Sequence, residues 1–302
     1  MRHPKRICYY HGGCADGFAS AYVLYMKYSN MEFVPSYHNG GVPNPSEYKD
    51  KEVYIVDFAF PLKEMQTMAK KAKNLYWYDH HKSSFEMLGR SVDENILETQ
   101  GNFKLVLTNA LSGVGITWFQ TFGEKPMPDL LKDIQDRDLW KLKRPNSKAV
   151  GEALYANRPW SFDQFINLSD PEVYMSLVEE GEELIYMRDK EITEAMKDLV
   201  PISLHGEPAL SLNTHRNISA LGNAIAEKHG CIAFMWTYKG PVDGVLCSMR
   251  SIGDIDVSII ATRMGGGGHK NAAGFNCELW ELINLIGEKE GQISTLIGEK
   301  EA

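Results

Sequence analysis

The chain has 302 residues, 43% of them hydrophobic and 24% charged. This is the composition of a globular protein with one large or two smaller domains. No apolar run approaches the about 20 residues that a membrane-spanning helix needs, and no signal-peptide pattern follows the basic N-terminus. The formal net charge is −8, without a basic run, which excludes a protein that grips long nucleic acid through a basic face. We expect a cytoplasmic protein with no membrane partner.

The cysteines support the same compartment. There are five of them, an odd number, and no two form a CxxC pair: Cys8, Cys14, Cys231, Cys247 and Cys277. Reduced thiols in the cytosol fit this usage better than a disulfide framework.

The first half of the chain alternates between predicted strands and predicted helices. Apolar and β-branched runs indicate strands over residues 6–10, 52–60 and 75–81, and helix-like segments follow at 18–28 and 61–74. A strand–helix–strand order is typical of a parallel sheet with crossover helices. In such sheets ligands bind at the carboxyl ends of the strands.

Longer helical segments come next. A turn and a helix are predicted over 108–123, a helix running into a loop over 127–142, and a long helix over about 172–199. The long helix carries one apolar stripe, which indicates core or interdomain packing: Val178, Ile185, Ile192, Met196 and Leu199. Pro201 closes it.

The C-terminal third has a different pattern. Two strands over 230–240 and 242–251 are joined by a glycine-rich hairpin signal, and a helix over 254–264 has Asp254 or Asp256 near its start. The tail repeats the six residues "LIGEKE", first from Leu285 and again from Leu296. Two short copies are too few for a solenoid.

Metal-capable side chains stand at the ends of the three predicted N-terminal strands: His11, Asp57, Asp79, His80 and His81. Each of them alone is more often a structural loop residue. Their coincidence at three successive strand ends favours a metal centre. Imidazole with carboxylate suits zinc, manganese or iron, and two-metal hydrolases hold ions about 3.5–4 Å apart with a shared carboxylate.

A second candidate site lies in the C-terminal third. Consecutive glycines allow backbone N–H groups to approach an anion, and the run "GGGGH" includes Gly266, Gly267, Gly268 and His269. Arg250, on a nearby predicted strand, offers a guanidinium fork that suits a phosphate. A flexible loop is the alternative interpretation of the glycines.

Five motifs resemble those of the DHH phosphoesterase superfamily. They follow one another along the chain in the order typical of that family, and together they cover most of it. "YDHHK" over 78–82 looks like the family signature, "HGGCADGFASA" over 11–21 like its first motif, and Asp57 after "VYIV" like its second. "IQDRDLW" over 134–140 looks like the fourth, and residues 245–275 resemble the DHH-associated C-terminal domain. Relatives of this kind include RecJ-like exonucleases, nanoRNases and family II pyrophosphatases.

The resemblance implies an α/β fold with the active site in the cleft between two domains. A parallel-sheet DHH domain over 1–185 is joined by a linker helix over 186–200 to a smaller α/β substrate-binding domain over 201–302.

The resemblance also implies two divalent metal ions, manganese being the expected metal. One ion takes His11 and Asp57, the other takes Asp16, Asp57, His80 and Asp136, and Asp57 bridges them.

The implied catalytic residues are His81 and Asp79, with His81 contacting the substrate phosphate or assisting proton transfer. A water between the metals attacks phosphorus in line.

Two positions leave alternatives open. Cys14 stands where members of the family commonly carry a carboxylate, so it is a thiolate ligand, a bystander, or a sign that water replaces a protein ligand. In "DRD", Asp138 is the alternative to Asp136, which the alignment of motifs favours.

The sequence thus predicts a manganese-dependent phosphodiesterase or phosphatase acting on short oligonucleotides or small nucleotides. A pyrophosphatase or exopolyphosphatase is the first alternative, and a catalytically weak nucleotide-binding protein is the second. A homodimer is left open.

Overall fold

The structure of the protein is a computed structural model that describes residues 5–286. The "LIGEKE" copy that begins at Leu296 lies outside the described residues, as does most of the copy that begins at Leu285. Contacts divide the chain into two compact units, Met1–Ile185 and Tyr186–Ala302. The division falls inside the long helix α9 (Pro171–Ala195).

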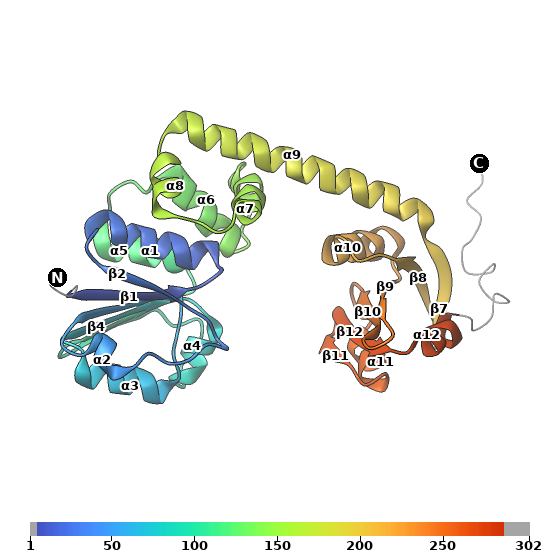
Figure 1. Ribbon diagram of the computed structural model, residues 1–302, viewed down its shortest axis with the longest axis horizontal. Coiled ribbons are helices and arrows are strands. Elements are labelled where there is room, and N and C mark those ends of the chain that lie inside the picture. Colours follow the sequence, from blue (N-terminus) through green and yellow to red (C-terminus); the bar gives the residue numbers. More distant parts are fainter. Residues whose placement is uncertain (1–4, 287–302) are drawn as a thin grey trace. The chain divides into compact units, whose positions relative to one another are not determined.

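The first unit is built on a six-stranded sheet (Figure 1). All neighbouring strands are parallel except the edge strand β5, which is antiparallel to β6. Across the sheet the strands are β2 (Glu32–Ser36), β1 (Arg6–His11), β3 (Glu52–Val56), β4 (Asn74–Asp79), β6 (Phe103–Leu107) and β5 (Ile96–Gln100).

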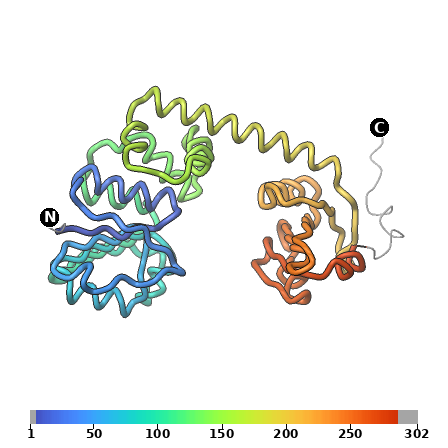
Figure 2. Tube along the Cα trace, viewed as in Figure 1, coloured from blue at the N-terminus to red at the C-terminus, as the bar shows by residue number. Residues whose placement is uncertain are grey.

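Helices cover both faces of this sheet, as Figures 1 and 2 show. One face carries α1 (Ala15–Lys27) and α5 (Gly113–Phe122), and beyond them α6 (Asp129–Asp138), α7 (Ser147–Ala156) and α8 (Phe162–Asn167). The other face carries α2 (Pro45–Tyr48), α3 (Leu62–Lys71) and α4 (Lys82–Met87).

The alternation of side chains along β1 explains why both faces are covered. Ile7 and Tyr9 are buried in the cluster that contains Met68 of α3, whereas Cys8 is buried with Leu24 of α1. Successive residues of a strand point to opposite faces, so a strand that is apolar at every position must be covered twice.

The second unit has a mixed six-stranded sheet, antiparallel except between β8 and β9. Across it the strands are β11 (Gly267–His269), β12 (Ala272–Cys277), β10 (Gly244–Arg250), β9 (Ile232–Gly240), β8 (Glu207–Asn213) and β7 (Val200–Leu204). Its helices are α10 (Ile218–His229), α11 (Val257–Arg263) and α12 (Leu279–Ile286), and a 3-10 turn, Met196–Asp198, follows α9.

The apolar stripe of the long helix serves two cores. Val178 is buried in a cluster of the first unit, with Ile185 packed against that cluster. Ile192 is buried in a cluster of the second unit, with Met196 and Leu199 against it. The stripe is therefore packing surface on both sides of the division.

Three smaller expectations concern single features. Asp256, not Asp254, is the N-cap of α11, since its side chain accepts a hydrogen bond from Ser258 N. All five cysteines are free thiols. Within residues 5–286, no helix has both the length and the apolar character needed to cross a membrane.

Candidate metal centre

Three parallel strands of the first unit end at the same edge of the sheet, and each brings a metal-capable side chain there. His11 is the last residue of β1, Asp57 follows β3 directly, and Asp79 ends β4, with His80 and His81 after it. Because the carboxyl ends of parallel strands lie at one edge, residues far apart in the chain become neighbours.

Asp57 lies in the middle of this group and is fully buried. Its Oδ2 is 3.4 Å from Nδ1 of His11. Its Oδ1 is hydrogen-bonded to Nε2 of His80 at 3.1 Å and lies 3.8 Å from Nδ1 of His81. Its φ of +55° is in the left-handed region, where a non-glycine residue costs about 1–3 kcal/mol and commonly marks a functional position.

Asp16, in the first turn of α1, approaches the same ring nitrogen of His80 as Asp57 does. Its Oδ1 accepts hydrogen bonds from Ser112 Oγ at 2.6 Å and from Val114 N at 3.1 Å. Its Oδ2 is 3.9 Å from Nε2 of His80, and Oδ2 of Asp138 is 3.3 Å from the same nitrogen. Asp16 is thus held by one oxygen and presents the other to His80.

Two groups of three side chains are compact enough to hold a cation. The potential ligand atoms of each group lie within 4.8 Å of one another: His11, Asp57 and His81 in the first, Asp16, His80 and Asp138 in the second. Asp57 connects the groups through its contact with His80.

The buried polar atoms of these groups fit a metal centre. Oδ2 of Asp16, Oδ2 of Asp57 and Nδ1 of His11 are buried without a hydrogen-bond partner, since the 3.4 Å contact between the last two lacks hydrogen-bonding geometry. A buried polar atom without a partner is costly. A cation in the first group would satisfy the atoms of His11 and Asp57, and one in the second group would satisfy that of Asp16. Mixed imidazole and carboxylate ligands suit zinc, manganese or iron.

The pKa values show how strongly these groups influence one another. Burial, followed by the charges of Asp57 and Asp138, raises the pKa of Asp16 well above its usual range. Burial also opposes ionisation of Asp57, but the imidazoles of His11 and His80 outweigh it and lower its pKa. Burial lowers the pKa of His80, yet Asp57 and the two other carboxylates raise it to about 9.

Asp79, predicted to be catalytic, has both carboxylate oxygens occupied by its own loop. Oδ1 accepts hydrogen bonds from the backbone N–H groups of His80 and His81 and from Nδ1 of His81 at 2.7 Å, and Oδ2 accepts one from Ser84 Oγ. With 1% of its surface exposed, Asp79 is placed to orient His81, and a direct catalytic role for it stays a prediction.

The structure places Asp138, not Asp136, beside His80. Asp136 turns away, and its two oxygens accept hydrogen bonds from the backbone N–H groups of Lys143 and Arg144. Burial alone would raise the pKa of Asp136, but these bonds and one from Ser147 lower it. The predicted ligand position Asp136 is therefore a loop-fixing residue, because side chains two residues apart on a helix point in different directions.

Cys14 belongs to neither group of candidate ligands. It is the N-cap of α1, and its side chain makes no capping hydrogen bond. Burial, then the charges of Asp57 and Asp16, raises the pKa of the thiol. The role of Cys14 at the centre stays open between the alternatives that the sequence leaves.

Sequence reasoning missed the segment that holds Asp16. Ser112 is the N-cap of α5, and Gly113 follows it. A Cβ on Gly113 would lie 2.6 Å from Cβ of Asp57 and 2.7 Å from Oδ2 of Asp16, so only glycine fits there. The "SG" before a predicted helix was the available signal.

His38 was missed as well. It lies in the loop after β2, with its ring centroid 5.2 Å from that of His11 and 5.0 Å from that of Phe58. Burial, then the charges of His11 and His81, lowers its pKa. The sequence feature that could have identified His38 was a histidine directly before a turn-forming segment, in "YHNGG".

Two of the predicted substrate residues of the second unit, Arg250 and His269, share one row of its sheet. Ala272 of β12 pairs with Arg250 of β10 on one side and with His269 of β11 on the other, so both side chains lie on the same face. Arg250 donates hydrogen bonds to Ser219 Oγ and to the carbonyl oxygen of Met249, both at 2.9 Å.

The glycine run has a structural reason of its own. A Cβ on Gly268, whose φ is +146°, would lie 2.5 Å from the carbonyl oxygen of Ala272, and a Cβ on Gly266 would collide with the carbonyl oxygen of Gly274. Gly267 has open space around its Cα. Two of these glycines are therefore required by close packing of β11 on β12, and an anion-binding role for the run stays a prediction.

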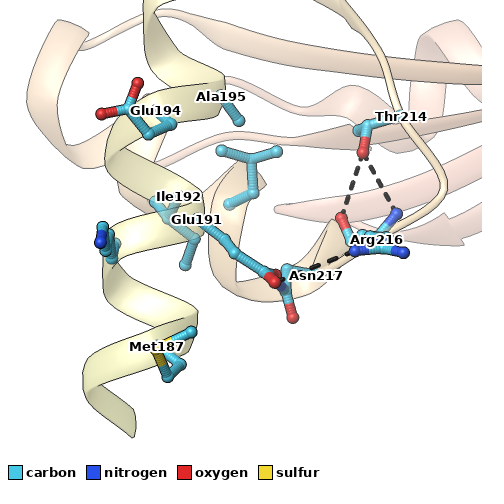
Figure 3. Close-up of a pocket in the computed structure, with 10 residues that line it drawn as sticks. Met187, Glu191, Ile192, Glu194, Ala195, Thr214, Arg216 and Asn217 are labelled. Carbon is cyan, nitrogen blue, oxygen red and sulfur yellow. Dashed lines mark hydrogen bonds and ion pairs between the residues drawn. The ribbon is translucent and has the colours of Figure 1, made fainter. Parts of the chain in front are cut away.

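A hollow of about 370 Å³ also lies in the second unit, between α9 and the start of α10 (Figure 3). At its edge Asn217 donates a hydrogen bond to Glu191 at 2.9 Å, and Arg216 lies 3.9 Å from the same carboxylate. None of the predicted site residues lines it.

The fold is similar to that of a known phosphodiesterase. The pGpG-specific phosphodiesterase PggH from Vibrio cholerae superimposes with a TM-score of 0.53 at 12% identity, over 92% of this chain and 95% of that one. The chain has the DHH phosphoesterase fold. A crystal structure of exonuclease RecJ bound to manganese is less similar, with a TM-score of 0.46 at 17% identity over 94% of this chain and 88% of that one.

In sequence, the chain is 27% identical over 289 residues to "uncharacterized protein R106" of Acanthamoeba polyphaga mimivirus. That alignment covers 89% of this chain and 66% of the viral protein, slightly less than two thirds of its length. No protein-family model matches the chain.

Proposed function

We propose that the protein is a metal-dependent phosphoesterase that hydrolyses short oligonucleotides or small nucleotides. The observation that carries this proposal is the pair of adjoining histidine–carboxylate groups with three buried, unpartnered ligand atoms. The fold shared with a phosphodiesterase supports the reaction class. The net charge of −8 and the lack of a basic run support a short substrate.

The first ion would be held by His11, Asp57 and His81, and the second by Asp16, His80 and Asp138. Bound divalent ions, manganese in our proposal, would supply a water of lowered pKa and offset the charge of the phosphate. The carboxylate of Asp57, between the two groups, is the proposed shared ligand.

Hydrogen bonds within the protein orient the side chains that would ligate the ions. Asp79 is an acceptor, so Nδ1 of His81 carries the proton in their 2.7 Å hydrogen bond, which leaves the lone pair of Nε2 as the one that His81 would offer to the first ion. Ser112 and Val114 fix one oxygen of Asp16 and leave the other free. In the second unit, Arg250 and His269 are the proposed contacts to a remote phosphate.

A product-resolved assay tests this function. With Mn²⁺, the protein should release mononucleotides from RNAs of two to five nucleotides. Asp57→Asn should abolish that activity, because it removes the proposed shared ligand. Survival of the activity in Asp57→Asn would exclude the shared-ligand assignment.

The same assay separates the alternatives. Release of orthophosphate from polyphosphate, with no cleavage of RNA, would support an exopolyphosphatase. Tight nucleotide binding without turnover of any phosphate ester would support a binding protein.

A further inference from the structure

A pocket of about 360 Å³ opens directly beside the second candidate metal group. Asp16 and Asp138 of that group line one part of it, and Arg137, Trp140, Leu154 and Tyr155 are among the residues that line the rest. Its volume lies in the range of about 300–1,000 Å³ that is typical of small-ligand sites. Metal-ligating carboxylates and an aromatic wall therefore share one hollow in the first unit.

Trp140 is unusual for a tryptophan. It is 67% exposed, so burial of its ring does not explain its presence. Its φ of +53° lies in the left-handed region, which costs a non-glycine residue about 1–2 kcal/mol. A large apolar side chain kept exposed on a strained backbone points to a role outside folding.

Neighbouring residues hold the aromatic wall in place. The guanidinium of Arg137 lies 4.3 Å from the centroid of the Trp140 ring. Gly151 makes room for that arginine, since a Cβ there would lie 3.2 Å from its Cγ and Nε. Tyr155 is anchored beside Asp16, because its hydroxyl accepts a hydrogen bond from Ala15 N at 3.4 Å.

The chemistry of this wall matches a nucleobase. Unpaired bases stack on aromatic rings and on arginine planes, and arginine N–H groups donate to base edges. Trp140 is two residues from Asp138, so the stacking surface and the metal group are joined by a single turn of chain.

We propose that the pocket binds the nucleobase next to the phosphate under attack, with the paired Arg137 and Trp140 as the stacking wall. This inference rests on the proposed function. It identifies the substrate as a phosphoester that carries a base, as opposed to an inorganic phosphate chain.

Steady-state kinetics with Mn²⁺ test the pocket. The substrates are a 5′-phosphorylated RNA dinucleotide and its analogue without bases. Trp140→Ala should raise KM for the dinucleotide by about 5- to 150-fold, the range for losing one base–aromatic stack. The same variant should leave KM for the analogue unchanged. Trp140→Phe, which keeps a ring, should retain most of the affinity.

Phe119→Ala is the matched control, because Phe119 is a 52% exposed aromatic of the same unit that does not line the pocket. Its KM values should equal those of the wild type. An unchanged KM for the dinucleotide in Trp140→Ala, or an equal rise for both substrates, would overturn the base pocket.

Binding distinguishes failure of the pocket from failure of the proposed function. If the wild type cleaves no phosphoester, the function is wrong. Calorimetric titration with adenosine 5′-monophosphate and with ribose 5-phosphate then tests the pocket alone. A Trp140→Ala variant that loses affinity only for the first ligand supports it, and equal affinity in variant and wild type for both contradicts it.

Discussion

Single residues decide where a cation could bind, and Asp57 shows how. Its carboxylate is buried, sits on a left-handed backbone and has one oxygen without a partner. Each of these features is unfavourable in a protein with nothing bound. Together they make Asp57 the residue on which the proposed metal centre most depends.

The two aspartates of "DRD" give the sharpest test at this scale. Asp138→Asn should lower Mn²⁺ affinity by more than the about 10- to 100-fold typical of losing an outer-shell partner. Calorimetric titration with Mn²⁺ measures this affinity.

Asp136→Asn is the matched control for that variant. It replaces an oxygen that accepts a backbone hydrogen bond, so unfolding should become easier by about 1–3 kcal/mol with Mn²⁺ affinity unchanged. The reverse pattern, with loss of metal binding in Asp136→Asn alone, would return the ligand role to Asp136.

Cys14 gives a second test. Serine is a better N-cap than cysteine, and a capping hydrogen bond contributes about 0.5–2 kcal/mol, so Cys14→Ser should raise the melting temperature. Mn²⁺ affinity and activity should stay at the wild-type level, because the thiol belongs to neither ligand group. A large drop in Mn²⁺ affinity, measured by titration, would make the thiol a ligand.

At the scale of elements, the centre depends on where helices begin. The first turn of α1 supplies Asp16, and the start of α5 supplies the two groups that hold it, Ser112 and Val114. Helix N-termini favour carboxylates through their free N–H groups and their dipole. The junction between a strand and the next helix is thus the structural unit of this site.

Gly113 tests that junction. Gly113→Ala would place a methyl group against Asp57 and Asp16, so Mn²⁺ affinity should fall by about 10- to 100-fold, as for other changes just outside a ligand shell. Phe119→Ala is the control, since Phe119 is an exposed residue of the same helix. Equal Mn²⁺ affinity in the two variants would show that α5 does not constrain the centre.

At the scale of the whole molecule, each of the two units carries a different part of the proposed function. Both candidate metal groups lie within the first unit, among residues 11–138, and the proposed phosphate contacts Arg250 and His269 lie within the second. Metal binding and remote substrate binding should therefore be separable by mutation.

Arg250→Ala tests this division. KM for a short RNA should rise by about tenfold, as for a lost hydrogen bond to a charged group, and Mn²⁺ affinity should not change. Arg263→Ala, on α11 of the same unit, is the control and should leave both unchanged. A lower kcat with an unchanged KM in Arg250→Ala would show that Arg250 does not bind substrate.

How much the sequence predicts depends on how local the signal is. The strand ends at His11, Asp57 and Asp79 were predictable because apolar runs followed by polar residues mark strand termini. The short strands β2, β5 and β6 were not predicted, because their apolar residues form no pattern distinct from loop or helix.

The sequence by itself determined the α/β fold class, the edge of the sheet that carries the site and the residue types at that edge. Only the tertiary structure placed Asp138, and not Asp136, beside His80. It also occupied both oxygens of Asp79 with hydrogen bonds and brought Ser112 and His38 to the candidate centre. The physical reason is directional. Sequence spacing shows which residues are close along the chain, whereas ligation and hydrogen bonding depend on where side chains of different elements point.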